Sequence, residues 1–385
     1  MFMSRGSSRR RPLSVIVATL ALLMSACSSD SGESSSAAAD PAGEPPVAAT
    51  DVSTPSGDDD DSPAVGDWER VAAAEPCECS DGSPFHYWVR PADPTKVVFF
   101  LSGGGACFSA ETCGGSDPTF TVNLSDNESP DDGIFDPSNR DNPLSDYTFV
   151  VVPYCTGDLH LGTQTHDYGG GLVVNHVGHT NASTVLAAAA ERFPDAVDVV
   201  VAGSSAGSAS AALYGGLAAD SWPEADIAVI ADASAAYPGT PAITLAIGSL
   251  WGTTGGLPTW PATAGLAPED WSLHALFWNT EAHAPRVRFA SYNNAFDEVQ
   301  AVFSAMIGLD SANLVGLIDE TNAAIKARGV DLATWVAPGT DHTILGDDEL
   351  YEQTVEGQRL IDWLGDFIDG DPVDDVRCTD CGKPA

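Results

Sequence analysis

Residues 198–219 read DVVVAGSSAGSASAALYGGLAA, and this stretch decides the fold. The apolar, β-branched run at 198–202 predicts a buried strand, and the Ala-rich run at 208–219 predicts a helix. Between them, residues 203–207 match the pattern G-x-S-x-G, which is typical of a sharp strand-turn-helix element that exposes a serine hydroxyl. The start of the helix would direct N–H groups and the positive end of its dipole toward a bound carbonyl group. The sequence therefore predicts that Ser205 is a nucleophile, with an ordinary Gly/Ser-rich turn as the alternative.

Strand-like and helix-like runs alternate on both sides of this element. This order predicts a layered α/β fold with a largely parallel sheet. The expected strands are 96–101, 147–152, 226–231, 286–291 and 333–337, and the further expected helices are 182–193 and 351–367. Residues 238–285 interrupt the order and are predicted to form an inserted lid. Its four tryptophans either form the lid's own core or line a substrate groove: Trp251, Trp260, Trp271 and Trp278.

A serine nucleophile needs a base, and only three histidines follow Ser205 in the chain. His342 lies directly after the last predicted strand, where the base of a hydrolase with the chain order Ser, acid, His is expected. His274 and His283 fall within the lid and are expected to face solvent or the lid itself. His342 is therefore the predicted base.

The acid that orients the base should follow the preceding strand. Asp297 lies six residues after the expected strand 286–291 and is the predicted acid. Asp341 is a rival beside His342, but adjacent residues seldom let a carboxylate reach the outer imidazole nitrogen. Asp232 is a weaker rival, because it follows an earlier strand.

Three consecutive glycines, Gly103 to Gly105, follow the strand 96–101. Such a loop can turn backbone N–H groups inward and form an oxyanion hole together with the N–H of Ala206. A phosphate-binding turn is disfavoured, because no Lys and Ser/Thr follow at the Walker spacing.

Composition limits the function classes. The 385 residues contain 43% hydrophobic residues, enough for a large core, and carry a net charge of −39. This charge disfavours a nucleic-acid partner or a polybasic contact with anionic lipid. The predictions include no nucleic acid, no metal and no cofactor.

The N-terminal residues are predicted to serve in export. Residues 1–26 combine a basic start with a short apolar run and are interpreted as a lipoprotein signal peptide. Cys27 follows small residues that resemble a bacterial lipobox, so we expect lipidation there, with plain secretion or an uncleaved anchor as alternatives. Residues 27–66 are expected to be a lipidated, disordered acidic tether, and 67–385 the catalytic domain.

Seven cysteines remain after Cys27, and an exported protein is expected to use them in disulfides. A zinc cluster of Cys77, Cys79, Cys378 and Cys381 is the alternative, which an oxidising compartment disfavours. Because seven is odd, one thiol is left over or pairs with another molecule.

Several short motifs together resemble the pectin acetylesterase family, which includes Notum-type carboxylesterases. The resemblance covers most of residues 77–345, and its motifs occur in order at 79–87, 103–107, 142–143, 152–158, 203–207 and 294–300. It implies an α/β-hydrolase-like three-layer sandwich, and it departs from the family at Ala106, where a tryptophan is usual, and at Ser208, where a glycine is usual.

The resemblance also implies roles for individual residues. Ser205, Asp297 and His342 would form a catalytic triad. The oxyanion N–H groups would come from Gly105, Ala106 and Ala206, and the implied disulfides are Cys79–Cys155 and Cys107–Cys113.

The predicted function is a serine esterase of the bacterial cell envelope, lipid-anchored on the extracytoplasmic side or secreted. Its expected substrate is an O-acetyl ester on a polysaccharide, hydrolysed through an acyl-enzyme. A short-chain or lipid carboxylesterase acting on small esters is the first alternative. A glycan-binding surface lipoprotein without catalysis is the second.

Overall fold

The computed structural model describes residues 65–125 and 127–382, which belong to one compact unit. The predictions for the signal peptide, for Cys27 and for almost all of the tether lie outside these residues. None of the described helices is both long and apolar enough to cross a bilayer.

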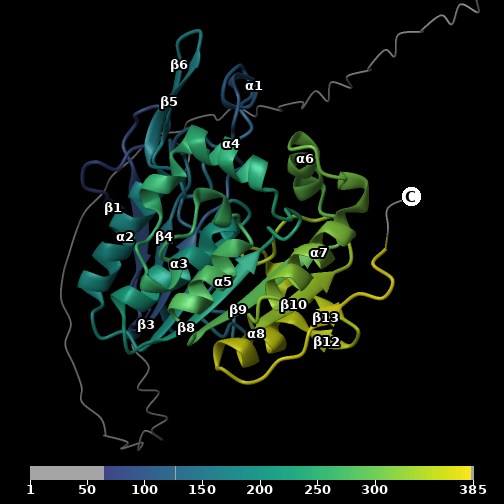
Figure 1. Ribbon diagram of the computed structural model, residues 1–385. Coiled ribbons are helices and arrows are strands. Elements are labelled where there is room, and N and C mark those ends of the chain that lie inside the picture. The colour runs from purple at the N-terminus through teal and green to yellow at the C-terminus, as the bar shows by residue number, and fades with distance from the viewer. Residues whose placement is uncertain (1–64, 126, 383–385) are drawn as a thin grey trace, which may run out of the picture. The chain divides into compact units, whose positions relative to one another are not determined.

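A mostly parallel sheet of nine strands forms the centre of the described region (Figure 1). Its order is β1-β2-β4-β3-β7-β8-β9-β10-β13. The seven strands from β4 to β13 run parallel, while β1 pairs with β2, and β2 with β4, in antiparallel fashion. The strands are β1 (Glu69–Ala72), β2 (His86–Arg90), β3 (Asp93–Leu101), β4 (Tyr147–Val152), β7 (Asp198–Ser204), β8 (Asp226–Asp232), β9 (Val287–Asn294), β10 (Leu332–Ala337) and β13 (Val376–Arg377).

Helices cover both faces of this sheet, so the predicted three-layer α/β fold is confirmed (Figure 1). Alternate side chains of each central strand point to opposite faces. Phe99 and Val201 pack on one face with α2 (Gly178–Arg192), α3 (Ser208–Ser221) and α5 (Ala275–His283). Phe100 and Val200 pack on the other face with α8 (Leu360–Ile368). The remaining helices are α1 (Ala110–Cys113), α4 (Pro241–Trp251), α6 (Glu298–Met306) and α7 (Leu314–Lys326).

Short elements connect these layers. Two small hairpins lie outside the main sheet, formed by β5 (Gln164–Gly169) with β6 (Leu172–His176) and by β11 (Thr354–Val355) with β12 (Gln358–Arg359). The 3-10 helices are η1 (Gly133–Phe135), η2 (Thr253–Gly256), η3 (Pro261–Thr263), η4 (Pro268–Asp270), η5 (Ser311–Asn313) and η6 (Asp348–Tyr351).

The predicted helix at 351–367 is correct only in its second half. The helix α8 begins at Leu360, because the hairpin β11–β12 occupies the preceding residues. Glu356 and Gly357 at its turn have φ angles of 50° and 86°, the left-handed pair that a tight hairpin turn requires. These two residues cannot continue a right-handed helix.

The predicted lid contains two different parts. Its first part forms α4 and several 3-10 helices, and within α4 only Trp251 is buried. Its last part forms α5, whose Leu276 and Phe277 belong to the main core. Within the predicted lid, α4 therefore lies outside the main core, whereas α5 packs into it together with Trp260 and Trp271.

Candidate active site

Ser205 lies on a strained turn between β7 and α3. Its φ of 54° is unusual for a residue with a side chain, and its backbone N–H donates to the carbonyl of Asp232 over 2.8 Å. Gly207 is required at this turn, because a Cβ there would lie 1.9 Å from the carbonyl oxygen of Leu101. The tight approach of strand and helix leaves the Ser205 hydroxyl at the carboxyl edge of the sheet.

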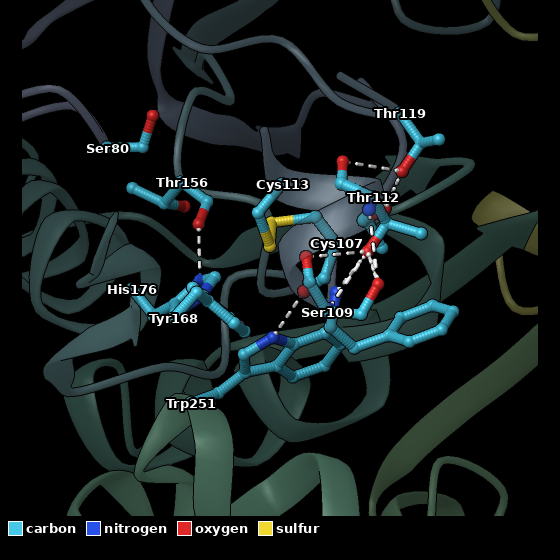
Figure 2. Close-up of a disulfide and its surroundings, with 12 residues drawn as sticks. Ser80, Cys107, Ser109, Thr112, Cys113, Thr119, Thr156, Tyr168, His176 and Trp251 are labelled. Atoms are coloured by element: carbon cyan, nitrogen blue, oxygen red, sulfur yellow. Dashed lines mark hydrogen bonds between the residues drawn. A yellow bond between two sulfur atoms is a disulfide. The ribbon is translucent and has the colours of Figure 1, made fainter. Parts of the chain in front are cut away.

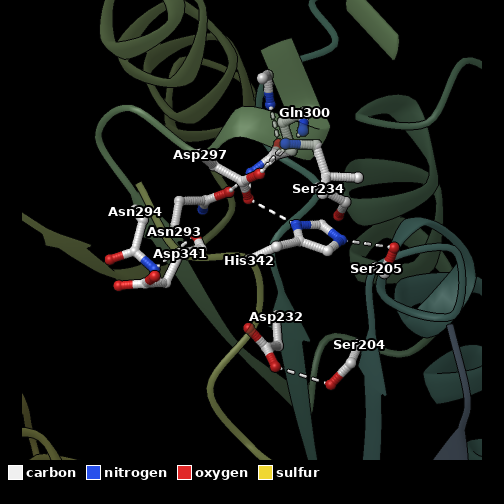
Figure 3. A network of polar contacts seen from close by, with 12 residues as sticks. Ser204, Ser205, Asp232, Ser234, Asn293, Asn294, Asp297, Gln300, Asp341 and His342 are labelled. Carbon is white, nitrogen blue, oxygen red and sulfur yellow. Dashed lines mark hydrogen bonds and ion pairs between the residues drawn. The ribbon is translucent and has the colours of Figure 1, made fainter. Parts of the chain in front are cut away.

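The structure brings the three residues of the predicted triad together (Figure 3). Ser205 Oγ lies 2.7 Å from His342 Nε2, and His342 Nδ1 lies 2.7 Å from Asp297 Oδ2. A carboxylate accepts, so Nδ1 carries the proton and Nε2 is free to accept the hydroxyl proton of Ser205. This arrangement has the geometry of a nucleophile, its base and the group that orients the base.

Asp297 is fully buried and held by its own helix. It is the N-cap of α6, where its Oδ1 accepts the N–H groups of Val299 and Gln300, each over 2.9 Å. The side-chain amide of Gln300 donates to Oδ2 over 3.0 Å. These donors compensate for removing the carboxylate from water and fix its position beside His342.

The rival residues have other positions. Asp341 is exposed, and its backbone carbonyl accepts a hydrogen bond from Asn294. His283 stacks on Trp260 and lies 2.7 Å from Asp220, while His274 packs beside Trp278.

Asp232 does not orient His342, but it joins the two parts of the site. Its Oδ2 accepts from Ser204 Oγ over 2.7 Å and from the N–H groups of Ile344 and Leu345 over 3.0 and 3.1 Å. Burial raises the pKa of this carboxyl group. Asp232 thus connects the turn that carries Ser205 to the loop that carries His342, a role that the sequence order did not reveal.

The glycine-rich loop lies against Ser205 as predicted, but one of its expected donors is already used. Gly105, with a φ of 79°, lines the cavity beside Ser205 together with Ala106 and Ala206. The N–H of Ala106, however, donates to the carbonyl of Thr119 over 3.2 Å. A β-bridge between Gly105 and Phe120 accompanies this hydrogen bond, and the role of Ala106 as an oxyanion donor stays a prediction.

A disulfide braces this loop, as Figure 2 shows. Cys107 and Cys113 are bonded, and the carbonyl of Cys107 accepts from the indole N–H of Trp251 over 2.8 Å. His176 lies beside the disulfide, but its Nδ1 donates to Thr156 and its Nε2 accepts from Tyr168. Burial lowers the pKa of His176 to about 4, so its imidazole is neutral near pH 7. The two cysteine sulfurs beside it are joined in a disulfide, and both of its ring nitrogens are used in hydrogen bonds.

Four of the five other described cysteines also form disulfides, rather than the alternative zinc cluster. Cys79 is bonded to Cys155, as the resemblance implied, and Cys378 to Cys381. The leftover thiol among the described cysteines is Cys77, which is buried. The four-cysteine metal site is therefore wrong, because three of its four sulfurs are in disulfides.

An apolar cavity of about 160 Å³ opens beside Ser205 and His342. None of the residues that line it is Asp, Glu, Lys or Arg. Ile243 and Ile247 of α4 form one part of its wall, and Phe303 and Ile307 at α6 form another. Trp251 and Trp271 of the predicted lid also line it, and both Trp260 and Trp271 belong to the main core.

The alternative in which lid tryptophans line a groove fits Trp251 and Trp271, but the aliphatic part of the cavity wall was not predicted. A signal was present, because residues 233–268 contain no Asp, Glu, Lys, Arg or His in a chain with a net charge of −39. We call residues 233–268 the uncharged segment. It supplies much of the cavity wall, from Ala233 to Leu257.

Comparisons with known proteins agree with this fold and site. The family model Pectinacetylesterase matches residues 68–236, which include Ser205, Gly105 and Ala206 but neither Asp297 nor His342. The chain is 35% identical over 100 residues to the palmitoleoyl-protein carboxylesterase NOTUM of Schmidtea mediterranea. It is 30% identical over 140 residues to the palmitoleoyl-protein carboxylesterase notum2 of Xenopus laevis.

These sequence matches are partial. They cover 24% and 34% of this chain and only 19% and 27% of the two relatives. The structural likeness extends further: the crystal structure of the Wnt deacylase Notum from Drosophila covers 80% of this chain and 95% of its own, with a TM-score of 0.59 and 17% identity. The α/β-hydrolase-like architecture is therefore confirmed. The chain is related to the pectin acetylesterase family with its Notum-type members, as the motifs indicated.

Proposed function

We propose that this chain is an exported serine carboxylic-ester hydrolase. The observation that carries the proposal is the line from Asp297 through His342 to Ser205, with 2.7 Å at each step, at the edge of an apolar cavity. The relatives' names, which describe carboxylesterases, support the same reaction class.

The first half of the proposed reaction forms an acyl-enzyme. His342 Nε2 takes the proton of Ser205 as its Oγ attacks the ester carbonyl carbon. The N–H groups of Gly105 and Ala206 hold the resulting oxyanion, and Asp297 stabilises the imidazolium. His342 then gives its proton to the departing alcohol oxygen, which breaks the ester bond and leaves the acyl group on Ser205.

The second half releases the acid. A water molecule gives its proton to His342 and attacks the acyl carbonyl carbon. The second tetrahedral intermediate collapses, Ser205 takes back the proton, and the carboxylic acid leaves. No other reactant is consumed.

The shape of the cavity supports an apolar acyl group of more than two carbons. Its volume of about 160 Å³ is close to that of an engineered apolar cavity, about 150 Å³, that binds benzene. An acetyl group would fill a small part of this space. We infer an acyl chain of about six carbons or more, and the relatives' palmitoleoyl substrates point the same way.

The O-acetyl ester of a polysaccharide remains the alternative substrate. A sugar ring needs several hydrogen-bond partners, and the cavity wall offers few polar side chains. An acetylated polymer would therefore have to bind outside the cavity.

Export is part of the same proposal. Three disulfides in the described region and the predicted signal peptide support an extracytoplasmic location, and Cys27 is the proposed lipid attachment site. The partner would then be a membrane, reached through that anchor.

The experiment compares hydrolysis of p-nitrophenyl acetate, butyrate and octanoate by the chain without residues 1–27 and by its Ser205→Ala variant. We expect kcat/KM to rise from acetate to octanoate, and Ser205→Ala to lose at least about 1000-fold. Acetate release from acetylated pectin and xylan is measured in parallel.

Folded proteins with equal rates for wild type and Ser205→Ala would refute the esterase proposal. A preference for acetate, with acetate release from a polysaccharide, would refute the acyl-chain assignment and leave the esterase intact.

A further inference from the structure

The two helices that line the cavity also expose apolar side chains. Among the described residues, eight large hydrophobic side chains are exposed, and four of them lie on α4 or α6: Leu245, Val299, Val302 and Met306. Single exposed apolar residues are ordinary, but a group around one opening is not.

On α4, inner and outer apolar residues alternate over slightly more than one turn. Ile243 and Ile247 line the cavity, whereas Leu245 between them is 43% exposed. Every residue of this helix is uncharged, and its only buried residue is Trp251. Contact with water is unfavourable for the apolar residues on the outer side of such a helix.

On α6 the same arrangement recurs. Phe303 lines the cavity, while Val302 and Met306 are 52% and 43% exposed. Val299 belongs to both sets, because it lines the cavity and is 37% exposed. Through Val299 the wall of the cavity is continuous with the exposed apolar side chains of α6, and Figure 1 shows α4 and α6 at the same end of the molecule.

Charge is distributed in the opposite way. The chain has 55 acidic and 16 basic residues, yet the uncharged segment that contains α4 has none, and α6 has only Glu298. Leu245 therefore lies in a stretch of chain without charged side chains, and Glu298 is the one charged residue of the helix that carries Val302 and Met306. An anionic partner would be repelled by the rest of the surface.

We propose that this rim, defined by Leu245, Val299, Val302 and Met306, docks on a neutral or zwitterionic lipid surface. On that surface, the acyl ester would pass from the lipid phase directly into the cavity. This inference rests on the proposed esterase function and adds its source of substrate. The predicted lipid anchor at Cys27 would keep the domain beside such a surface, and the acyl region beneath the headgroups offers no polar groups that the rim would need to match.

Cosedimentation with phosphatidylcholine vesicles tests the docking. The chain without residues 1–27, which contains the whole compact unit and cannot be lipidated at Cys27, is compared with Leu245→Asp and Val302→Asp. Val197→Asp is the matched control: Val197 is also 52% exposed but precedes β7 at the opposite edge of the sheet from Ser205. We expect each rim variant to bind at least about tenfold more weakly, and the control to bind as the wild type does.

Three results would overturn the docking proposal. They are equal binding by the rim variants and the control, stronger binding when half of the lipid is anionic phosphatidylglycerol, and self-association without vesicles that Val302→Asp abolishes. The last would make the rim an interface between two copies of the chain.

Turnover of soluble p-nitrophenyl butyrate, measured on the same proteins, separates the two proposals. The rim variants should retain it, because neither Leu245 nor Val302 lines the cavity. Absent turnover in the wild type contradicts the esterase; normal turnover without vesicle binding contradicts only the docking.

Discussion

The carboxyl ends of the central strands and the uncharged segment meet at Ser205, but they are built in opposite ways. At the strand ends, buried carboxylates are surrounded by donors: Asp297 accepts three hydrogen bonds besides that of His342. The uncharged segment forms its part of the cavity wall almost without such polar contacts, from residues such as Ile243 and Ile247.

This contrast suggests that the two regions have different roles in the reaction. Hydrogen bonds to a buried charge are directional, so the strand ends can hold reacting atoms in a fixed geometry. Apolar contacts are not directional and depend on area, so the uncharged segment can select an acyl group by size. Changes in the first region should affect the rate for every ester, and changes in the second should affect the choice among esters.

The largest effect is expected for Asp297→Asn. An amide at this position can donate to His342 Nδ1, which favours the wrong imidazole tautomer, so kcat should fall by about 10³–10⁴-fold for acetate and octanoate alike. Steady-state kinetics with both esters measures the change. Asp341→Asn is the matched control on the adjacent exposed acid and should stay within about twofold of wild type. Similar losses in both variants would contradict the assignment of the acid.

A smaller, selective effect is expected for Ile247→Phe. The larger ring narrows the cavity, so the ratio of kcat/KM for octanoate over acetate should fall by about tenfold while acetate turnover is retained. Leu245→Phe places the same ring on the outer side of the same helix and should leave the ratio unchanged. An equal fall in kcat/KM for both esters in Ile247→Phe would contradict the proposed difference in role between the two regions.

A different kind of effect, on folding stability rather than on rate, is expected at the strand ends. Burial raises the pKa of Asp158 to about 6, while its oxygens accept from Thr156 and Gly178. The folded protein therefore holds this proton more tightly than the unfolded chain does. The resulting stability is fully present below about pH 4 and is lost as the pH rises through about 6, a change of about 2–3 kcal/mol.

Urea unfolding at several pH values tests this behaviour. Asp158→Asn keeps the shape, because Thr156 can accept from the new amide, and should remove that part of the pH dependence. Asp195→Asn removes the same charge from an exposed loop. If the pH profile of Asp158→Asn matched those of Asp195→Asn and wild type, the buried carboxyl group would not titrate as described.

The same contrast explains what the sequence could predict. The strands β3, β4, β7, β8, β9 and β10 were visible, because strands buried on both faces read as continuous apolar runs. The three candidate triad residues could be selected because each lies directly after such a strand or within a few residues of its end: Ser205, Asp297 and His342. Edge strands such as β1, with its exposed residues, and the two-residue β13 carry no such signal.

The cavity and the bond between Ala106 and Thr119 could not be predicted from local patterns. The cavity depends on segments that are distant in the chain, such as α4 and α6. The hydrogen bond joins two segments that are connected by an irregular loop. Asp232 was recognised only as a possible acid, because a bridging role depends on where the loop at 344–345 comes to lie.

The most direct test of the account is to find the acyl-enzyme. The wild-type chain is quenched with acid during turnover of p-nitrophenyl octanoate and then digested, and the modified peptide is located by mass spectrometry. We predict an octanoyl group on Ser205, and none in Ser205→Ala. Turnover that proceeds with the octanoyl group on another residue, or with no covalent adduct under conditions where deacylation is slowed, would contradict the central claim.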